Sequence, residues 1–230
     1  MSRIILMAVM LAVTVAGCNR FPDLSIQVTA NLAPDDSTCT VDAEQTEVLF
    51  RGLYDLGAPF QSDYVVTPRI ESYIINNSLE IQGTQGNIQI TSFDVTIKTP
   101  DGNVAELSGG SLPNPYRVTT SVVIPANETP EGISRGAAAA GVIPASYQGA
   151  LNELRGSTGF DSIILDIRAN GTTAGGFGQQ SPAFSWPVDF CDGCLGIPAC
   201  AQDQAEELTG CLPGQDRWTY CETIVPTTSP

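Results

Sequence analysis

Seven cysteines are the residues of this chain with the widest choice of chemistry. A thiol can form a disulfide, bind zinc as a thiolate, exchange with another disulfide or act as a nucleophile. Cys18 stands alone behind an apolar N-terminal run. The other six are Cys39, Cys191, Cys194, Cys200, Cys211 and Cys221. Their neighbours and spacings favour some of these chemistries over others.

Setting Cys18 aside leaves an even number of cysteines, which in an exported protein indicates three disulfides. Six cysteines allow many pairings, and spacing alone does not select one. Five of the six follow residue 190, and five cannot pair among themselves. We therefore expect Cys39 to bridge to the tail. Closing so long a loop contributes ~3–5 kcal/mol in the chain-entropy model.

Two other uses of the tail cysteines are open. Cys191-Asp-Gly-Cys194 has the spacing of a thioredoxin-type redox pair, but such pairs begin a helix beside a βαβ unit, and neither pattern is visible. The C-x2-C-x5-C-x10-C series is rich enough in thiols for zinc, although an oxidising envelope favours disulfides. Acidic pairs such as Asp35-Asp36 and Asp189/Asp192 match no calcium loop. We expect no metal, cofactor or catalytic residue.

Met1–Gly17 is typical of a signal peptide, with one basic residue and then an apolar run too short to span a bilayer. It ends in Val15-Ala16-Gly17-Cys18, which resembles the lipobox of bacterial lipoproteins: a branched residue, two small residues and cysteine. The resemblance implies cleavage before Cys18 and lipid attachment there, with acyl chains such as palmitate holding the protein on a membrane. Asn19, where such families often carry an inner-membrane aspartate, favours the outer membrane. The alternative is an ordinary signal peptide with a chance cysteine.

Charge and composition exclude several function classes. Removing residues 1–17 takes away one of ten basic residues and none of the 25 acidic ones, so the formal charge moves from −15 to −16. Such a charge argues against binding of nucleic acid. The chain has no histidine, which excludes imidazole-based catalysis, and Lys98 is its single lysine. A carboxylate-based hydrolase is the remaining enzyme class, and no pair of acids stands out for it.

Short segments of alternating apolar and polar residues, separated by Gly, Pro, Asn and Asp, dominate the middle of the chain. A change of parity in the 87–98 segment predicts a bulge at Thr91-Ser92, and Pro100–Asn103 predicts a turn. The spacing of Tyr147, Ala150, Leu151 and Leu154 predicts a helix opened by Pro144 and stopped by Gly156. The expected strands are 24–30, 47–53, 63–66, 72–79, 87–98, 104–107, 116–124, 162–169 and 184–190.

This pattern predicts a mainly β protein: an antiparallel β-sandwich, immunoglobulin-like or transthyretin-like, with a short helical insertion and a disulfide-stapled C-terminal tail. The expected division is a signal peptide over 1–17, a lipid anchor and tether over 18–23, the sandwich over 24–190 and a Cys-rich tail over 191–230 packed on it. The helical insertion is expected at about 133–156. A helical turn or two is expected at Ala201–Leu208.

The segments Phe184-Ser-Trp-Pro-Val-Asp-Phe-Cys-Asp-Gly-Cys-Leu195 and Cys211-Leu-Pro-Gly-Gln-Asp216 resemble the C-terminal signature of uncharacterised Cys-rich lipoproteins of Gram-negative bacteria. The resemblance covers the lipobox and roughly the last 50 residues. It implies a final strand that feeds directly into a stapled tail, with a Pro-Gly-Gln-Asp turn near its end. It implies no activity.

The expected function is that of a lipid-anchored, non-catalytic structural or interaction module at the outer membrane, with an envelope protein or a glycan as partner. A carbohydrate- or small-ligand-binding lipoprotein, using Trp186 or Trp218, is the alternative, and a carboxylate-based hydrolase is the third. No nucleic acid partner is expected.

Replacing the anchor residue tests the localisation. In Cys18→Ala there is no thiol to accept the lipid, so we expect the variant to move from the membrane fraction to the soluble fraction and to lose labelling by a radioactive fatty acid. Cys39→Ala is the matched control and should keep the label. Continued labelling of Cys18→Ala would show that the anchor lies elsewhere.

Overall fold

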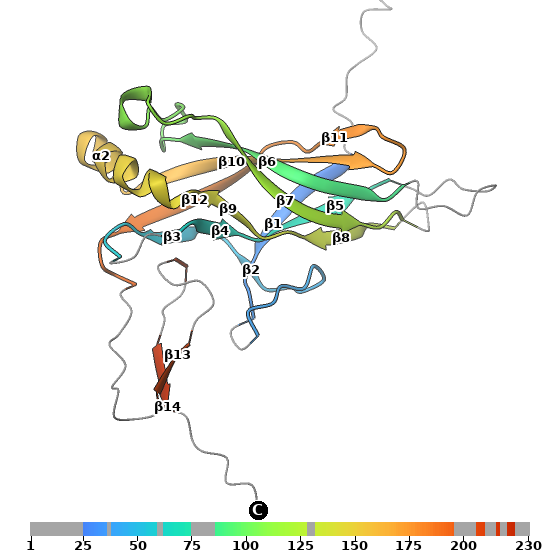
Figure 1. Ribbon diagram of the computed structural model, residues 1–230, viewed down its shortest axis with the longest axis horizontal. Helices are drawn as coiled ribbons and strands as arrows, with labels where there is room; N and C mark the ends of the chain where they lie inside the picture. Colours follow the sequence, from blue (N-terminus) through green and yellow to red (C-terminus); the bar gives the residue numbers. More distant parts are fainter. Residues whose placement is uncertain are drawn as a thin grey trace, which may run out of the picture.

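The computed structural model describes residues 25–35, 38–58, 62–74, 86–127, 132–195, 206–209, 215–216 and 220–223. In these residues strands predominate and there is one α-helix, so the expected mainly β fold with a short helix is confirmed. Figure 1 shows α2 at one end of the long strands and β11 at the other. The strands form two principal sheets, sheet A and sheet B.

Sheet A has the strand order β2-β1-β5-β8, and every neighbouring pair is antiparallel. In that order its strands are Val48–Leu49, Ile26–Leu32, Pro68–Ser72 and Ser134–Ala137.

Sheet B has the strand order β3-β12-β10-β6-β7. Its strands are Gly52–Asp55, Phe184–Cys191, Ser162–Thr173, Ile88–Lys98 and Tyr116–Ile124. The neighbours are antiparallel, except that β3 runs parallel to β12. Strand β11, Gly178–Gln180, folds back on the end of β10 as a hairpin.

A short two-stranded ladder continues sheet A beyond β5 and β8. It pairs β4, Tyr64–Val66, with β9, Ala140–Ile143. The register is maintained across the gap, since Val66 pairs with Ala140 and Arg69 pairs with Ala137. The ladder is interrupted at Pro68, which has no N–H to donate. Instead, Thr67 is bonded to β1 through the side chain of Asn31.

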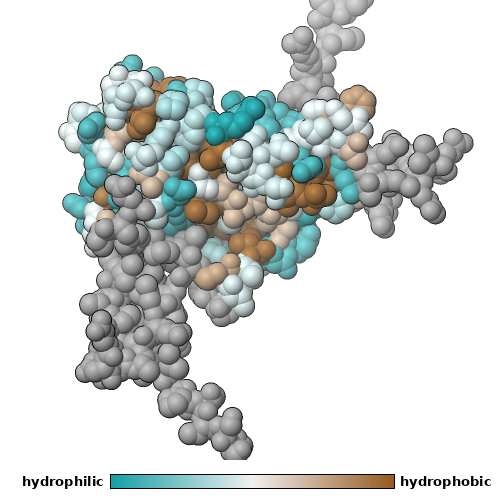
Figure 2. Space-filling view, in the orientation of Figure 1, coloured by the Kyte–Doolittle hydropathy of each residue, from teal (hydrophilic) through white to brown (hydrophobic). Residues whose placement is uncertain are grey.

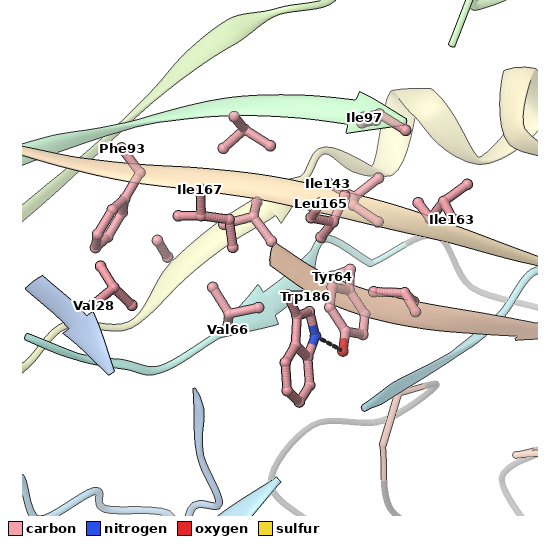
Figure 3. Packing of buried hydrophobic residues seen from close by; sticks show 14 of the residues in the cluster. Val28, Tyr64, Val66, Phe93, Ile97, Ile143, Ile163, Leu165, Ile167 and Trp186 are labelled. Atoms are coloured by element: carbon pink, nitrogen blue, oxygen red, sulfur yellow. Dashed lines mark hydrogen bonds between the residues drawn. The ribbon is translucent and has the colours of Figure 1, made fainter. Parts of the chain in front are cut away.

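One hydrophobic core lies between the sheets. It contains Val28 from sheet A, Val66 from β4, and Phe93, Leu165 and Ile167 from sheet B, all buried. Figure 3 shows the Phe93 ring directed toward Val28 across the space between the strands. Full burial of each such side chain contributes about 1.5–3 kcal/mol, so this shared core is what holds the two sheets together.

The local details predicted for β6 are confirmed. Its pairing with β7 shifts between Ile90 and Ser92, which is the bulge expected at Thr91-Ser92. The chain then turns at 100–103, where Gly102 has a φ of +89° and donates its N–H to Thr99. The partner strand expected at 104–107 is reduced to a single bridge between Lys98 and Val104.

The helical insertion expected at about 133–156 is wrong over its first half. Residues 134–143 form β8 and β9, and a short 3-10 turn, η2, Ala145–Tyr147, leads into helix α2, Gln148–Thr158. The small residues of this stretch serve close strand packing, because a Cβ on Gly136 would lie 2.8 Å from Cγ1 of Ile124 in β7. The helix runs past Gly156 to Thr158 and is capped by Gly159, whose φ is +73°.

Two further expectations need correction. The strand predicted over 72–79 begins earlier, as β5 over Pro68–Ser72, and residues 75–79 lie outside the described residues. The helical turns expected at 201–208 are replaced, where the chain is described, by β13, Glu206–Thr209. This strand pairs with β14, Tyr220–Thr223. The spacing of residues within 201–208 carries no information about that later partner strand, so it could not predict the pairing. No helix in the described residues is long and apolar enough to cross a membrane.

Candidate functional site: two buried carboxylates at the base of the tail

Two of the six tail-related cysteines are paired with each other. Cys191, at the end of β12, forms a disulfide with Cys194. Cys39 is also disulfide-bonded, and its expected bridge to the tail stays a prediction. Cys221 lies in β14. The remaining site residues that were expected from the sequence lie outside the described residues: Cys18, Cys200 and Cys211.

The Cys191–Cys194 loop is built around the fully buried carboxylate of Asp55. Oδ1 of Asp55 accepts the backbone N–H of Gly57 at 2.9 Å and that of Gly193 at 2.7 Å, and Oδ2 accepts that of Leu195 at 2.8 Å. Asp55 reaches the loop because β3 runs parallel to β12 and places Asp55 opposite Cys191. By accepting three hydrogen bonds, the carboxylate satisfies the backbone N–H groups of the loop and so stabilises its conformation.

The disulfide between Cys191 and Cys194 limits what this cluster can do chemically. One carboxylate oxygen of Asp55 and the sulfurs of Cys191 and Cys194 lie within 4.8 Å of one another, a spacing that suits a metal. However, zinc binds thiolates, and here the two sulfurs are bonded to each other. The pair also follows a strand rather than opening a helix, the setting that lowers thiol pKa values in redox pairs. The arrangement favours a structural staple.

A second buried cluster joins the tail to both layers of strands. The Tyr64 hydroxyl, in β4, accepts the indole N–H of Trp186, in β12, at 3.1 Å and donates to Oδ1 of Asp216 at 2.9 Å (Figure 3 shows the Tyr64–Trp186 bond). The same Oδ1 accepts the Leu53 N–H at 2.7 Å. The neighbouring Gln215 side chain bonds both the N–H and the C=O of Val65, each at 2.8 Å. Gln215-Asp216 therefore docks against β3 and β4 as an added edge.

Burial perturbs the ionisation of this cluster. It raises the pKa of Asp216 to about 6, against the opposing effect of the hydrogen bonds from Leu53, Tyr64 and Gln215. Oδ2 of Asp216 is buried and has no hydrogen-bond partner in the described residues. Burial and the nearby Asp216 charge likewise raise the pKa of the Tyr64 hydroxyl, so Tyr64 stays protonated. The cluster thus holds one carboxyl that titrates near neutral pH.

The expectation that Trp186 might stack on a sugar is wrong. Trp186 is 2% exposed, lies in the core with its ring stacked against Phe184, and its one polar atom is used by Tyr64. Trp218, the other candidate, lies outside the described residues.

The outward face of sheet B carries ordered charge pairs. Arg117 contacts both oxygens of Asp94, with Nε to Oδ1 at 2.7 Å and Nη2 to Oδ2 at 3.2 Å. Lys98 pairs with Asp166, which also accepts the Ser185 hydroxyl at 2.6 Å. Burial opposes ionisation of Asp166, but these hydrogen bonds outweigh it and hold its pKa below the usual value. Arg168 lies beside Asp94 in the ladder and is exposed.

Sequence reasoning singled out Cys191, Cys194 and Trp186 but none of the polar side chains that bind the tail backbone or the Trp186 indole. Asp55 carries a weak signal, since aspartate two residues before glycine often accepts that backbone N–H in a turn. Asp216 was present in the Pro-Gly-Gln-Asp motif, but nothing in the motif shows that it is buried. Gln215 lies in the same motif without any sign of its role, and Tyr64 carried no signal, because the partners of both residues are distant in the sequence.

The raised pKa of Asp216 predicts a pH-dependent stability. Because an unfolded aspartate titrates near ~3.9 and the folded one at about 6, the folded state holds more protons between these values. Stability from this group is fully present below ~3.9 and is lost as the pH rises through about 6, by roughly 3 kcal/mol. Asp216→Asn stays neutral and should remove this slope from urea-unfolding free energies measured between pH 4.5 and 7.5.

Glu106→Gln, at an exposed acid, is the control for Asp216→Asn and should keep the wild-type slope. Asparagine tolerates the φ of +54° at residue 216, so the replacement adds no strain of its own. An unchanged slope in Asp216→Asn would mean that this carboxyl titrates normally.

Neutralising Asp55 should destabilise the protein. In the native protein the carboxylate accepts backbone N–H groups, whereas in Asp55→Asn an amide N–H₂ would face one of them and leave it without an acceptor. We therefore expect the free energy of unfolding of the oxidised protein to fall by ~2–4 kcal/mol. Asp192→Asn, on the same loop but exposed, should cost less than ~0.5 kcal/mol. Equal urea midpoints for the two variants would contradict the role given to Asp55.

Comparison with known proteins adds no relative. No protein-family model matches the chain, and no curated protein matches it. What the molecule does must therefore be inferred from the fold and the clusters described above.

Proposed function

We propose that this protein is a lipid-anchored structural or interaction module of the cell envelope, displayed at the outer membrane on an immunoglobulin-like sandwich. The anchor is the one expected at Cys18. The proposal assigns no catalytic step, because the two buried carboxylates, Asp55 and Asp216, are each used to hold backbone N–H groups. The observation that carries it is the ordered, mixed-charge outer face of sheet B.

The strand order favours the immunoglobulin-like over the transthyretin-like arrangement. Naming β1, β5 and β8 as strands A, B and E gives one sheet of order A-B-E. Naming β6, β7, β10 and β12 as C, C′, F and G gives the other sheet the order G-F-C-C′. Consecutive strands B and C, and C′ and E, then lie in opposite sheets, as Greek-key connections require. Helix α2 fills the connection from E to F.

The outer face of sheet B differs in charge from the rest of the molecule. Four of the basic residues lie on it, namely Arg51, Lys98, Arg117 and Arg168, together with the acids Asp94, Asp166 and Asp189. The whole chain carries ten basic and 25 acidic residues, so this face is close to neutral while the protein is strongly acidic. Alternating charges on a rigid sheet suit a complementary protein surface, since they fix register and reject wrong partners. We assign another envelope protein as the partner.

A smaller feature favours the alternative of a small-ligand-binding lipoprotein. A hollow of about 290 Å³ opens on the sheet A side. Small and mostly apolar residues line it: Pro34, Cys39, Val41, Val65, Thr67, Ala137 and Ala139. Its size is at the lower limit of small-molecule sites. This hollow is the second candidate for a functional site, and Trp186 does not contribute to it.

Site-specific photo-cross-linking in intact cells tests the proposed face. A photoreactive residue in place of Thr96, on the outer face of β6, should give a discrete adduct with one envelope protein. Adding Arg168→Glu should reduce that adduct at least about tenfold, because reversing a charge at an interface costs more than ~1.4 kcal/mol. Thr29 is the matched control, also a half-buried strand threonine but on the outer face of sheet A. Equal adducts at Thr29 and Thr96, or indifference to Arg168→Glu, would contradict the assignment.

A further inference from the structure

Exposed apolar side chains gather at one end of the described domain. Phe177, in the turn between β10 and β11, is 72% exposed, and Val123, near the end of β7, is 58% exposed. Tyr73 and Ile133, which flank β5 and β8 at the same end, are 39% and 43% exposed. Figure 2 shows brown, apolar surface toward the end where Figure 1 places β11. A large exposed apolar patch generally marks a contact site.

The turn that presents Phe177 satisfies its own backbone. Thr173 donates its N–H to the Phe177 carbonyl at 2.9 Å, and the Phe177 N–H is accepted by the Thr173 hydroxyl at 3.1 Å. Gly176 donates to Thr173 and has a φ of +83°, which favours glycine there. The Phe177 ring lies so close to Gly175 that a Cβ there would be 3.3 Å from it. Pairing of these N–H groups inside the turn lowers the cost of bringing the tip into an apolar medium.

The same hairpin contacts the start of the domain, where the chain comes from the expected anchor. The Ser25 hydroxyl is hydrogen-bonded to the side chain of Gln179, in β11, and the Ser25 carbonyl accepts the Tyr73 N–H at 2.9 Å. Six residues separate Ser25 from Cys18, so the chain between them spans at most about 25 Å. Since Phe177 is two residues from Gln179, an anchor at Cys18 keeps the tip near the lipid surface.

The charge of the hairpin suits that position. No charged residue occurs between Arg168 and Asp189, although the protein as a whole has a formal charge of −15. An acidic surface is repelled by anionic lipid headgroups, whereas an uncharged hairpin is not. The hairpin beside the expected anchor therefore meets no charge repulsion at a bilayer.

From these observations we infer that the β10–β11 hairpin is a membrane contact. Phe177 inserts into the interfacial layer of the same bilayer into which the lipid on Cys18 is inserted. This inference rests on the proposed anchor. The lipid holds the protein on the membrane, and the hairpin fixes its orientation. The opposite end of the long strands, where Figure 1 shows α2, then faces away from the bilayer.

Lipid photo-cross-linking tests the contact in the full-length, acylated protein in cells. A benzophenone side chain in place of Phe177 should form adducts with phospholipid. The matched control is Phe50, which is 86% exposed and lies between β2 and β3. Burial of one phenylalanine corresponds to at least about a tenfold partition, so the lipid adduct at 177 should exceed that at 50 by about this factor.

The two proposals fail in different ways. If Cys18→Ala keeps its fatty-acid label, the anchor is wrong whatever Phe177 contacts. If the label depends on Cys18 but positions 177 and 50 give equal lipid adducts, the anchor stands and the membrane contact is overturned. Adducts of position 177 with a protein in place of lipid would also overturn it.

Discussion

The Tyr64 hydroxyl is the buried polar group at which strands of both sheets and the tail meet. It accepts a hydrogen bond from Trp186 of sheet B and donates one to Asp216, while its own strand extends sheet A. A buried hydroxyl must find partners, and here Tyr64 and its two partners come from three segments far apart in the sequence. A Cβ on Gly52 would lie 1.8 Å from this oxygen, so the glycine that begins β3 leaves the space that the hydroxyl occupies.

Near Tyr64, two buried carboxylates have a structural role. Asp55 shapes the disulfide loop, and Asp216 fixes the docked segment of the tail. Both bind backbone N–H groups, which are present whatever the neighbouring side chains are. A tail poor in apolar residues can thus be attached without a hydrophobic core of its own. The cost is a buried charge, which Asp216 reduces by taking up a proton near pH 6.

The sequence predicted the strands whose evidence is local. Segments 116–124 and 184–190 match β7 and β12 closely, and the bulge in β6 was visible as a change of parity at Thr91-Ser92. The strand at Gly136 was mistaken for part of a helical insertion, because the close contact that requires a glycine there is with Ile124, in another sheet. Strand order and both carboxylate clusters were beyond prediction, because each depends on partners brought together by folding. Burial, which gives Asp216 its role, has no signature in its neighbours.

The parallel pairing of β3 with β12 has a consequence for biogenesis. Asp55 and Gly193 are 138 residues apart, so a chain that emerges N-terminus first exposes β3 long before its partner arrives. Contacts of such long range slow folding and leave strand edges open to wrong partners in the meantime. Completion of sheet B is therefore a late event, and the Cys191–Cys194 loop, which follows β12 directly, takes its place on Asp55 only at that stage.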